Sequence, residues 1–222
     1  MNHKRIMHVA ALALLTSEIF AGGGTRVSVI GARNQDLVTT DNSLKLTINI
    51  TSKRFCVGDS EVSTVLLRLR LHYVNVGERP IILHKGSNVA PSILISKNVA
   101  DALADKHELT LSLSVLPSME PEIGEAQRLN DSFVVLRKGA SFDTRAEVPI
   151  PFASNDQSAT SSAIRKGDHV LQIGVITWPE STTLAERLRA KWKHRGYLWH
   201  RVVQSEPMPF KIDQQINFEN CR

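Results

Sequence analysis

Hydrophobic and polar residues alternate along most of this chain. The alternation is clearest in residues 44–50, 67–73 and 109–115, where every second residue is leucine, isoleucine, valine or tyrosine. The residues between them are polar or charged. A β-strand points successive side chains to opposite faces of its sheet, so this period predicts strands with one buried face and one face in water.

Shorter apolar runs continue the pattern and are separated by glycine-containing turns. The turns stand at residues 75–77, 138–139 and 166–168. Many short strands with such turns predict a mainly β protein, an antiparallel immunoglobulin-like β-sandwich. The alternation argues against an all-parallel sheet, whose strands are apolar on both faces. The further runs expected to be strands are residues 80–83, 93–95, 133–136, 148–152, 170–178, 198–203 and 210–212.

Two segments have a helical period instead. Residues 98–107 place Val99, Ala102 and Leu103 on one face of a short helix. The second segment is a helical insertion at about residues 183–196, where Thr183 and Glu186 have the spacing of a capping box and Gly196 is expected to end the helix.

The second helix has an apolar face and a basic face. Leu184, Leu188 and Trp192 fall within one narrow arc, which predicts that Trp192 is a core anchor. Arg189 and Lys193 are expected on the opposite side. Two interpretations of the basic side remain open: a solvated face, or a binding surface for an anionic partner. The candidate binding residues are Arg189, Lys193, His194 and His200.

The first residues read as a targeting segment. Residues 1–21 have a basic start, a short apolar run and a small residue at position 21, which is typical of a cleaved secretory signal. An uncleaved membrane anchor is the alternative. Cleavage leaves residues 22–222 as a single domain that is not membrane-spanning, and it predicts a periplasmic or extracellular protein.

Charge and cysteine content agree with export. The whole chain has a net charge of +5, and loss of Lys4, Arg5 and Glu18 with the signal leaves +4. A mildly basic exported chain is not expected to bind nucleic acid. Cys56 and Cys221 are an even pair in an exported protein, which favours one disulfide between them.

Three segments in sequence order resemble the strand pattern of immunoglobulin-like and fibronectin-type-III-like sandwiches found in exported bacterial proteins. They are LRLRLHYVNVGERPIIL, FVVLRKGASFDTRAEVPI and IRKGDHVLQIGVITW. The resemblance covers about residues 62–152 and 164–178, and it implies architecture without any functional residue. Such folds often have a tyrosine at the corner before the penultimate strand, where this chain has His169, expected to cap the corner.

The sequence holds no recognisable set of catalytic residues. It lacks a nucleophile elbow, a zinc-protease helix, a phosphate loop and a dinucleotide fingerprint. No metal site or cofactor is predicted, because His194 and His200 make only half a ligand set and the carboxylates of Glu120, Glu122 and Glu125 suit a solvated turn.

The leading hypothesis is therefore a non-catalytic exported binding or structural module, whose partner is an envelope protein or an anionic surface polymer. One alternative is an enzyme with a site assembled from dispersed polar residues, with the region of His194 and His200 and the carboxylates near Glu120 as candidates. Another is an inhibitor or chaperone-like module that acts by strand addition.

Overall fold

The computed structural model describes residues 42–57, 62–87, 89–112, 129–153, 162–178, 182–213 and 218–219. Residues 1–39 and 40–222 form separate units, and the described residues all belong to the second. The expected signal and the loop with Glu120, Glu122 and Glu125 lie outside the described residues. None of the helices within these ranges is both long and apolar enough to cross a membrane.

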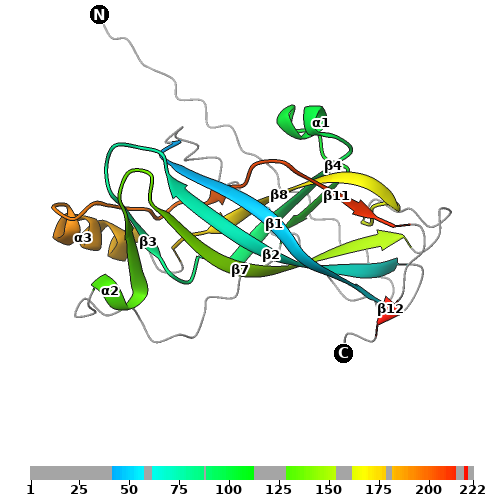
Figure 1. Ribbon diagram of the computed structural model, residues 1–222, viewed down its shortest axis with the longest axis horizontal. Helices are drawn as coiled ribbons and strands as arrows, with labels where there is room; N and C mark the ends of the chain where they lie inside the picture. Colours follow the sequence, from blue (N-terminus) through cyan, green and yellow to red (C-terminus); the bar gives the residue numbers. More distant parts are fainter. Residues whose placement is uncertain are drawn as a thin grey trace, which may run out of the picture. The chain divides into compact units, whose positions relative to one another are not determined.

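The described part of the chain is mainly β, as the alternation predicted (Figure 1). The strands are β1 (Leu44–Cys56), β2 (Val62–Asn75), β3 (Ile81–His84), β4 (Val89–Ser96), β5 (Leu109–Ser112), β6 (Phe133–Leu136), β7 (Ser141–Ala153), β8 (Gly167–Ile176), β9 (Tyr197–Leu198), β10 (Val203–Gln204), β11 (Met208–Ile212) and β12 (Phe218–Glu219). The helices are α1 (Val99–Leu103), α2 (Leu129–Ser132) and α3 (Thr182–Trp192).

Two larger sheets share one hydrophobic core. The first has the order β12-β1-β2-β7; in the second, of order β10-β8-β4-β5, β11 also pairs with β8. Leu67, Leu69, Leu71 and Tyr73 of β2 are fully buried, while the residues between them are exposed or half-buried. Because buried side chains of both sheets belong to the same cluster, one face of each sheet lies on this core.

Most strand pairs are antiparallel, as expected, but two pairs are parallel. These are β1 with β12 and β3 with β9. The run at residues 198–203 is also not one strand, because β9 ends at Leu198 and β10 begins at Val203.

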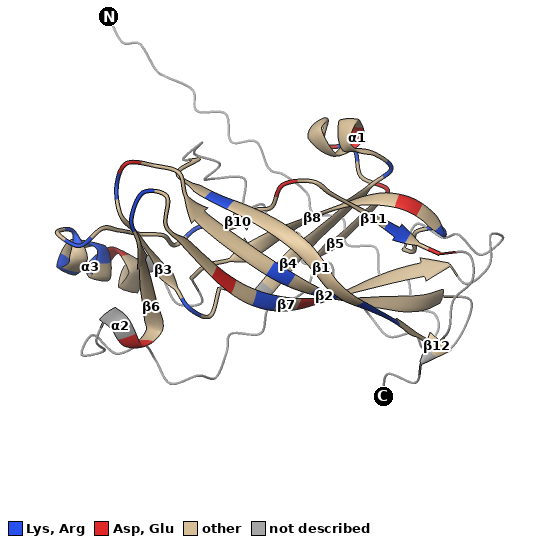
Figure 2. Cartoon of the chain, in the orientation of Figure 1, with Lys and Arg blue, Asp and Glu red and all other residues tan. Residues whose placement is uncertain are grey.

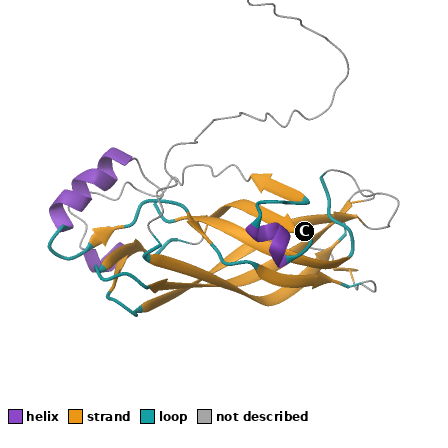
Figure 3. Ribbon diagram, turned by 90° about the horizontal axis from the view of Figure 1, so that it is seen from above, coloured by secondary structure: helices purple, strands orange, loops and turns teal. Residues whose placement is uncertain are grey.

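A third, smaller sheet of order β6-β3-β9 separates the main core from α3. All four residues of β3 are buried. Ile81 and Leu83 face the main core, whereas Ile82 belongs to a second cluster that includes Leu184, Leu188 and Trp192 of α3. Helix α3 therefore covers the face of the third sheet that points away from the main core (Figure 3).

Helix α3 begins and ends earlier than predicted. It starts at Thr182, so Thr183 lies inside the first turn and is not the N-cap of a capping box. It ends at Trp192 instead of Arg195, and the N–H groups of Arg195 and Gly196 donate to the Trp192 carbonyl at 2.7 and 3.2 Å in the closing turn. In helix α1, Ala102 is buried but Val99 and Leu103 are exposed, so the apolar face predicted for this helix is wrong.

His169, the third residue of β8, contacts the backbone of the segment that leads into this strand. Its ring is 6% exposed, and its Nε2 lies 2.8 Å from the carbonyl oxygen of Arg165, four residues upstream. Its Nδ1 lies 3.0 Å from Oε2 of Glu108, at the start of β5.

The two strands beside the predicted disulfide, β1 and β12, are neighbours in the first sheet. Cys56 pairs in register with Glu219, and Phe55 with Phe218. Cys221 follows two residues later but lies outside the described residues, so its bond to Cys56 stays a prediction. We expect thiol titration of unfolded, unreduced mature protein to find no reactive thiol, and two thiols per chain would show the prediction wrong.

A ladder of charged residues follows β2 and β7 on the outer face of the first sheet, which points away from the core. Figure 2 marks the positions of the acidic and basic residues along these strands. The Arg68 guanidinium lies 2.7 Å from Glu147, and that of Arg70 lies 2.7 Å from Asp143. His72 also contacts Asp143, with Nδ1 at 2.8 Å from Oδ1. Exposed pairs of this kind contribute little to stability.

The ladder still predicts a pH effect of known sign. Hydrogen bonds from Arg70 and His72 lower the pKa of Asp143 to about 2 from an ordinary 3.8. The stabilisation is therefore present above the ordinary pKa and is lost as the pH falls through about 2. We expect the urea midpoint of wild type to fall more than that of Asp143→Asn between pH 5 and pH 2. Parallel decreases would contradict this prediction.

Candidate functional site

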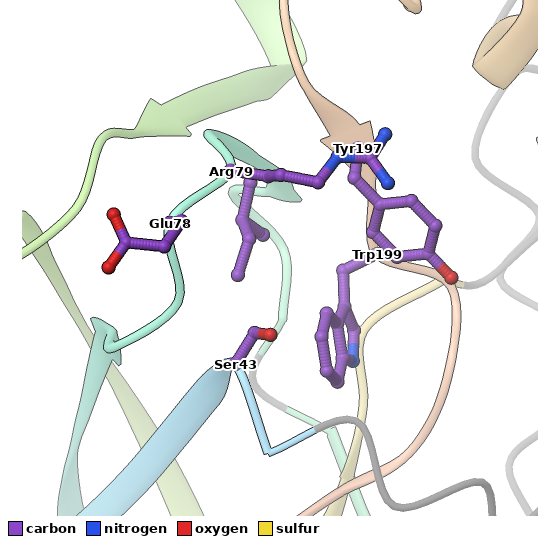
Figure 4. A pocket seen from close by; sticks show the side chains of 6 residues that line it. Ser43, Glu78, Arg79, Tyr197 and Trp199 are labelled. Carbon is purple, nitrogen blue, oxygen red and sulfur yellow. The ribbon is translucent and has the colours of Figure 1, made fainter.

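A small pocket opens where the start of β1, the loop before β3, and β9 come together (Figure 4). Its volume is about 250 Å³, at the lower end for small-molecule sites. It combines an apolar wall with hydroxyl groups, a carboxylate and a guanidinium. The lining residues are Ser43, Glu78, Arg79, Ile81, Tyr197 and Trp199.

Asn75 holds the loop that carries Glu78 and Arg79. Its side chain is fully buried, and Nδ2 donates at 2.8 Å to the carbonyl oxygens of both Arg79 and Leu136. Its Oδ1 accepts from the Gly77 N–H at 2.9 Å. A Cβ at Gly77 would lie 2.7 Å from the Ser43 side chain, so glycine permits the close approach of this loop to the start of β1. The Asn-Val-Gly turn in the sequence thus supports the loop of Glu78 and Arg79, which forms one wall of the pocket.

Gly196 fixes the opposite wall. A Cβ there would lie 2.6 Å from the Pro80 carbonyl oxygen, and the φ angle of Gly196 is 157°. The next residue, Tyr197, donates its N–H to that same oxygen at 2.8 Å. Glycine is therefore required by the close contact between the two walls, in addition to its place after helix α3.

Two arginines contact the ring of Tyr197. The guanidinium carbon of Arg189 lies 4.2 Å from the ring centroid, and that of Arg79 lies 5.7 Å away. Both distances are within the range of cation–π attraction. The expectation that Arg189 points away into solvent is wrong, because the turn after α3 brings Tyr197 back beside the helix and the half-buried Arg189 packs on its ring.

His200 lies in the electrostatic field of the same arginine. Burial lowers the pKa of His200 below its ordinary 6.5, and the charges of Arg189 and Arg201 lower it further. The Leu198 backbone and Glu186 act in the opposite direction. The His200 ring is therefore neutral at neutral pH, and its charge would appear only in acid.

The four predicted binding residues thus divide into two pairs. Arg189 and His200 adjoin the pocket wall made by Tyr197 and Trp199, whereas Lys193 and His194 are exposed in the turn after α3. Sequence reasoning missed Arg79, Tyr197 and Trp199. The available signal was the Gly-Tyr-Leu-Trp stretch directly after the basic helix, which joins aromatic rings to nearby positive charge.

The segment after β9 has unmet hydrogen-bonding capacity. Trp199 is 4% exposed and packs edge-to-face on Tyr197, with centroids 6.1 Å apart. Within the described ranges, Nε1 of Trp199 has no hydrogen-bond partner, and Nδ1 of His200 has none either. Buried polar atoms of this kind are few in folded proteins, so their position beside the pocket distinguishes this segment from the rest of the core.

No group of three or more histidine, cysteine, aspartate or glutamate side chains within the described ranges is placed to hold a metal ion. The dispersed enzyme site proposed from sequence paired the region of His194 and His200 with carboxylates near Glu120. Because Glu120 lies outside the described residues, that geometric test remains open.

No protein-family model and no curated protein matches the chain. Among solved structures, the chain is similar to an X-ray structure of a Northeast Structural Genomics Consortium target. The identity is 10%, the TM-score is 0.33, and the match covers 82% of this chain and 96% of the other.

Proposed function

We propose that this protein is an exported, non-catalytic binding module of immunoglobulin-like β-sandwich architecture, periplasmic or extracellular, that binds a small ligand group in the pocket beside Tyr197. Two sheets on one core support the architecture. The observation that carries the binding function is the convergence of side chains from three separate segments on one cavity.

The pocket walls are held rigidly by the surrounding structure, and this favours binding. The two walls are fixed by Asn75 on one side and by the contact between Gly196 and Pro80 on the other. A site whose walls are held in place loses less conformational entropy when a ligand enters, which is the general basis of preorganised binding. Loops at the ends of sandwich sheets are also where such folds commonly place recognition.

The test is ligand-observed NMR of mature protein, residues 22–222, with a library of neutral, cationic and anionic fragments. We expect a subset of fragments to show binding that Tyr197→Ala removes and Arg145→Ala preserves. Arg145 is an exposed arginine on the outer face of the first sheet, so its replacement controls for a general loss of positive charge. Equal binding by both variants would contradict a site in the pocket, and new product resonances would favour the enzyme alternative.

The strand-addition alternative has a specific place to act, the outer edge of β7. The Ala153 N–H donates to Ile164, and the Pro151 carbonyl accepts from Ile164, so these positions point their backbone groups away from β2. Pro149 shares this orientation by the two-residue period, and prolines offer no N–H to an added strand. Strand addition is therefore disfavoured at this end of β7 and would have to use residues 141–147.

Arg145→Pro separates the two mechanisms, because it removes an outward N–H of β7 without touching the pocket. One outcome is a protein partner that binds to wild type, Arg145→Ala and Tyr197→Ala but not to Arg145→Pro. That result would assign the binding site to the edge of β7 and not to the pocket.

A further inference from the structure

We propose that the pocket holds an oxyanion, the carboxylate or phosphate group of a small acid, at the guanidinium of Arg79, and that the guanidinium of Arg189 on the Tyr197 wall adds positive charge. This inference rests on the proposed binding function and adds the chemistry of the ligand. It also replaces the sequence-based expectation of a general basic face on α3 by a defined site with two named arginines.

Both arginines have unused hydrogen-bonding capacity. Each guanidinium contacts the ring of Tyr197, and within the described ranges neither forms an ion pair or a hydrogen bond. A guanidinium that rests on an aromatic ring can still donate along its edges, where its N–H groups match the spacing of two oxygens. Arg79 itself lines the pocket, and contact with the same ring keeps the positive charge of Arg189 beside the pocket wall.

The nearby carboxylates do not neutralise this pair. Glu78, which lines the pocket, forms its ion pair with Lys138. Glu186 on α3 lies close enough to affect His200, but it makes no ion pair with Arg189. The excess of positive charge in a partly enclosed cavity favours a ligand with negative charge.

His200 lies close enough to Arg189 to respond to its charge. Burial lowers the pKa of His200, and the charges of Arg189 and Arg201 lower it further. When the pH falls through this lowered pKa, His200 gains a positive charge beside Arg189. Because an anion stabilises that charge, the affinity for an oxyanion should rise with falling pH, and the bound ligand should raise the His200 pKa in turn.

The size and the walls limit what else the ligand contains. A volume of about 250 Å³ accommodates one ring or a short acid, not an extended chain. Ile81, Tyr197 and Trp199 supply an apolar and aromatic surface for the rest of the ligand. We therefore expect a group of about the size of a monosaccharide, either free or at the end of a larger molecule.

The experiment compares three matched probes by chemical-shift titration of mature protein: D-glucuronate, D-glucose 6-phosphate and D-glucose. At least one acid should bind while D-glucose does not, and comparison of the acids separates carboxylate from phosphate recognition. Arg79→Ala should weaken binding by about tenfold or more, because hydrogen bonds to charged groups are among the stronger ones. Arg189→Ala should weaken binding less, because Arg189 contributes its charge from beside the pocket wall. Arg145→Ala should bind like wild type. The affinity for D-glucuronate, whose carboxylate stays ionised over this range, should rise as the pH is lowered from 7.5 to 5.5, and His200→Gln should lose this rise.

The oxyanion site and the pocket as a binding site can be contradicted separately. Equal binding of the acid by Arg79→Ala, Arg189→Ala and wild type would overturn the oxyanion site. If D-glucose or a neutral fragment binds as tightly as the acids and is lost in Tyr197→Ala, the pocket stands and the anionic ligand is wrong. If no acid binds at either pH, the inference is also wrong, whatever the fragment library finds.

Discussion

Trp192→Ala should lower the free energy of unfolding by about 3–5 kcal/mol, the usual cost of removing a buried tryptophan. Trp192 is 6% exposed and meets Phe133 edge-to-face, with ring centroids 5.0 Å apart. Phe133 also stacks on Trp178 at 6.1 Å. These aromatic contacts form the centre of the second cluster, which is small, so few other side chains can fill the space that an alanine would leave.

Urea unfolding of the variant, with Lys193→Ala as control, measures this effect. Lys193 is the next residue and is exposed, so its replacement should change stability by no more than about 0.5 kcal/mol. A Trp192→Ala protein with unchanged stability would show that α3 does not depend on this cluster. If such a protein failed to bind small acids, Trp192 would instead have to be assigned to the ligand.

The sequence predicted the long strands because their chemistry is local. In β1 and β2, each buried leucine or isoleucine is followed by a polar residue, and this period is sufficient to define a strand and its inner face. The third sheet has no such signal. Every residue of β3 is buried, because the main core lies on one face and α3 on the other. A short apolar run predicts a strand but does not show that two separate clusters enclose it.

The candidate site was less predictable because it depends on contacts between distant parts of the chain. Arg79 and Tyr197 meet only because β3 and β9 pair in parallel, in the register Ile81 with Tyr197. Nothing in the local sequence of either residue shows this pairing. The contact of Arg189 with Tyr197 was not predicted, since helical periodicity alone does not show that the chain turns back beside the helix.

Asn75 illustrates the same limit. Its Asn-Val-Gly context predicts a turn, and the turn is present. Its side chain, however, also binds the carbonyl of Leu136 at the end of β6, 61 residues away. A turn residue thereby connects the first sheet, the third sheet and the loop of Arg79.

Asn75→Ala should therefore be nearly as destabilising as Trp192→Ala, by about 2–4 kcal/mol, because each buried group left without a partner costs about 1–3 kcal/mol. The variant removes the donor for the carbonyls of Arg79 and Leu136 and the acceptor for the Gly77 N–H. Asn49→Ala, on an exposed position of β1, is the matched control and should be close to neutral.

Asn75→Asp provides a more specific test, since it keeps the shape of the side chain. The acceptor for Gly77 remains, but an oxygen replaces the nitrogen that donates to Arg79 and Leu136. We expect the aspartate variant to be at least as unstable as the alanine variant at pH 7, because a buried oxygen would face two carbonyl oxygens. A neutral effect of Asn75→Asp in urea unfolding would mean that these hydrogen bonds do not hold the loop. The position of Arg79, on which the proposed oxyanion site depends, would then need another cause.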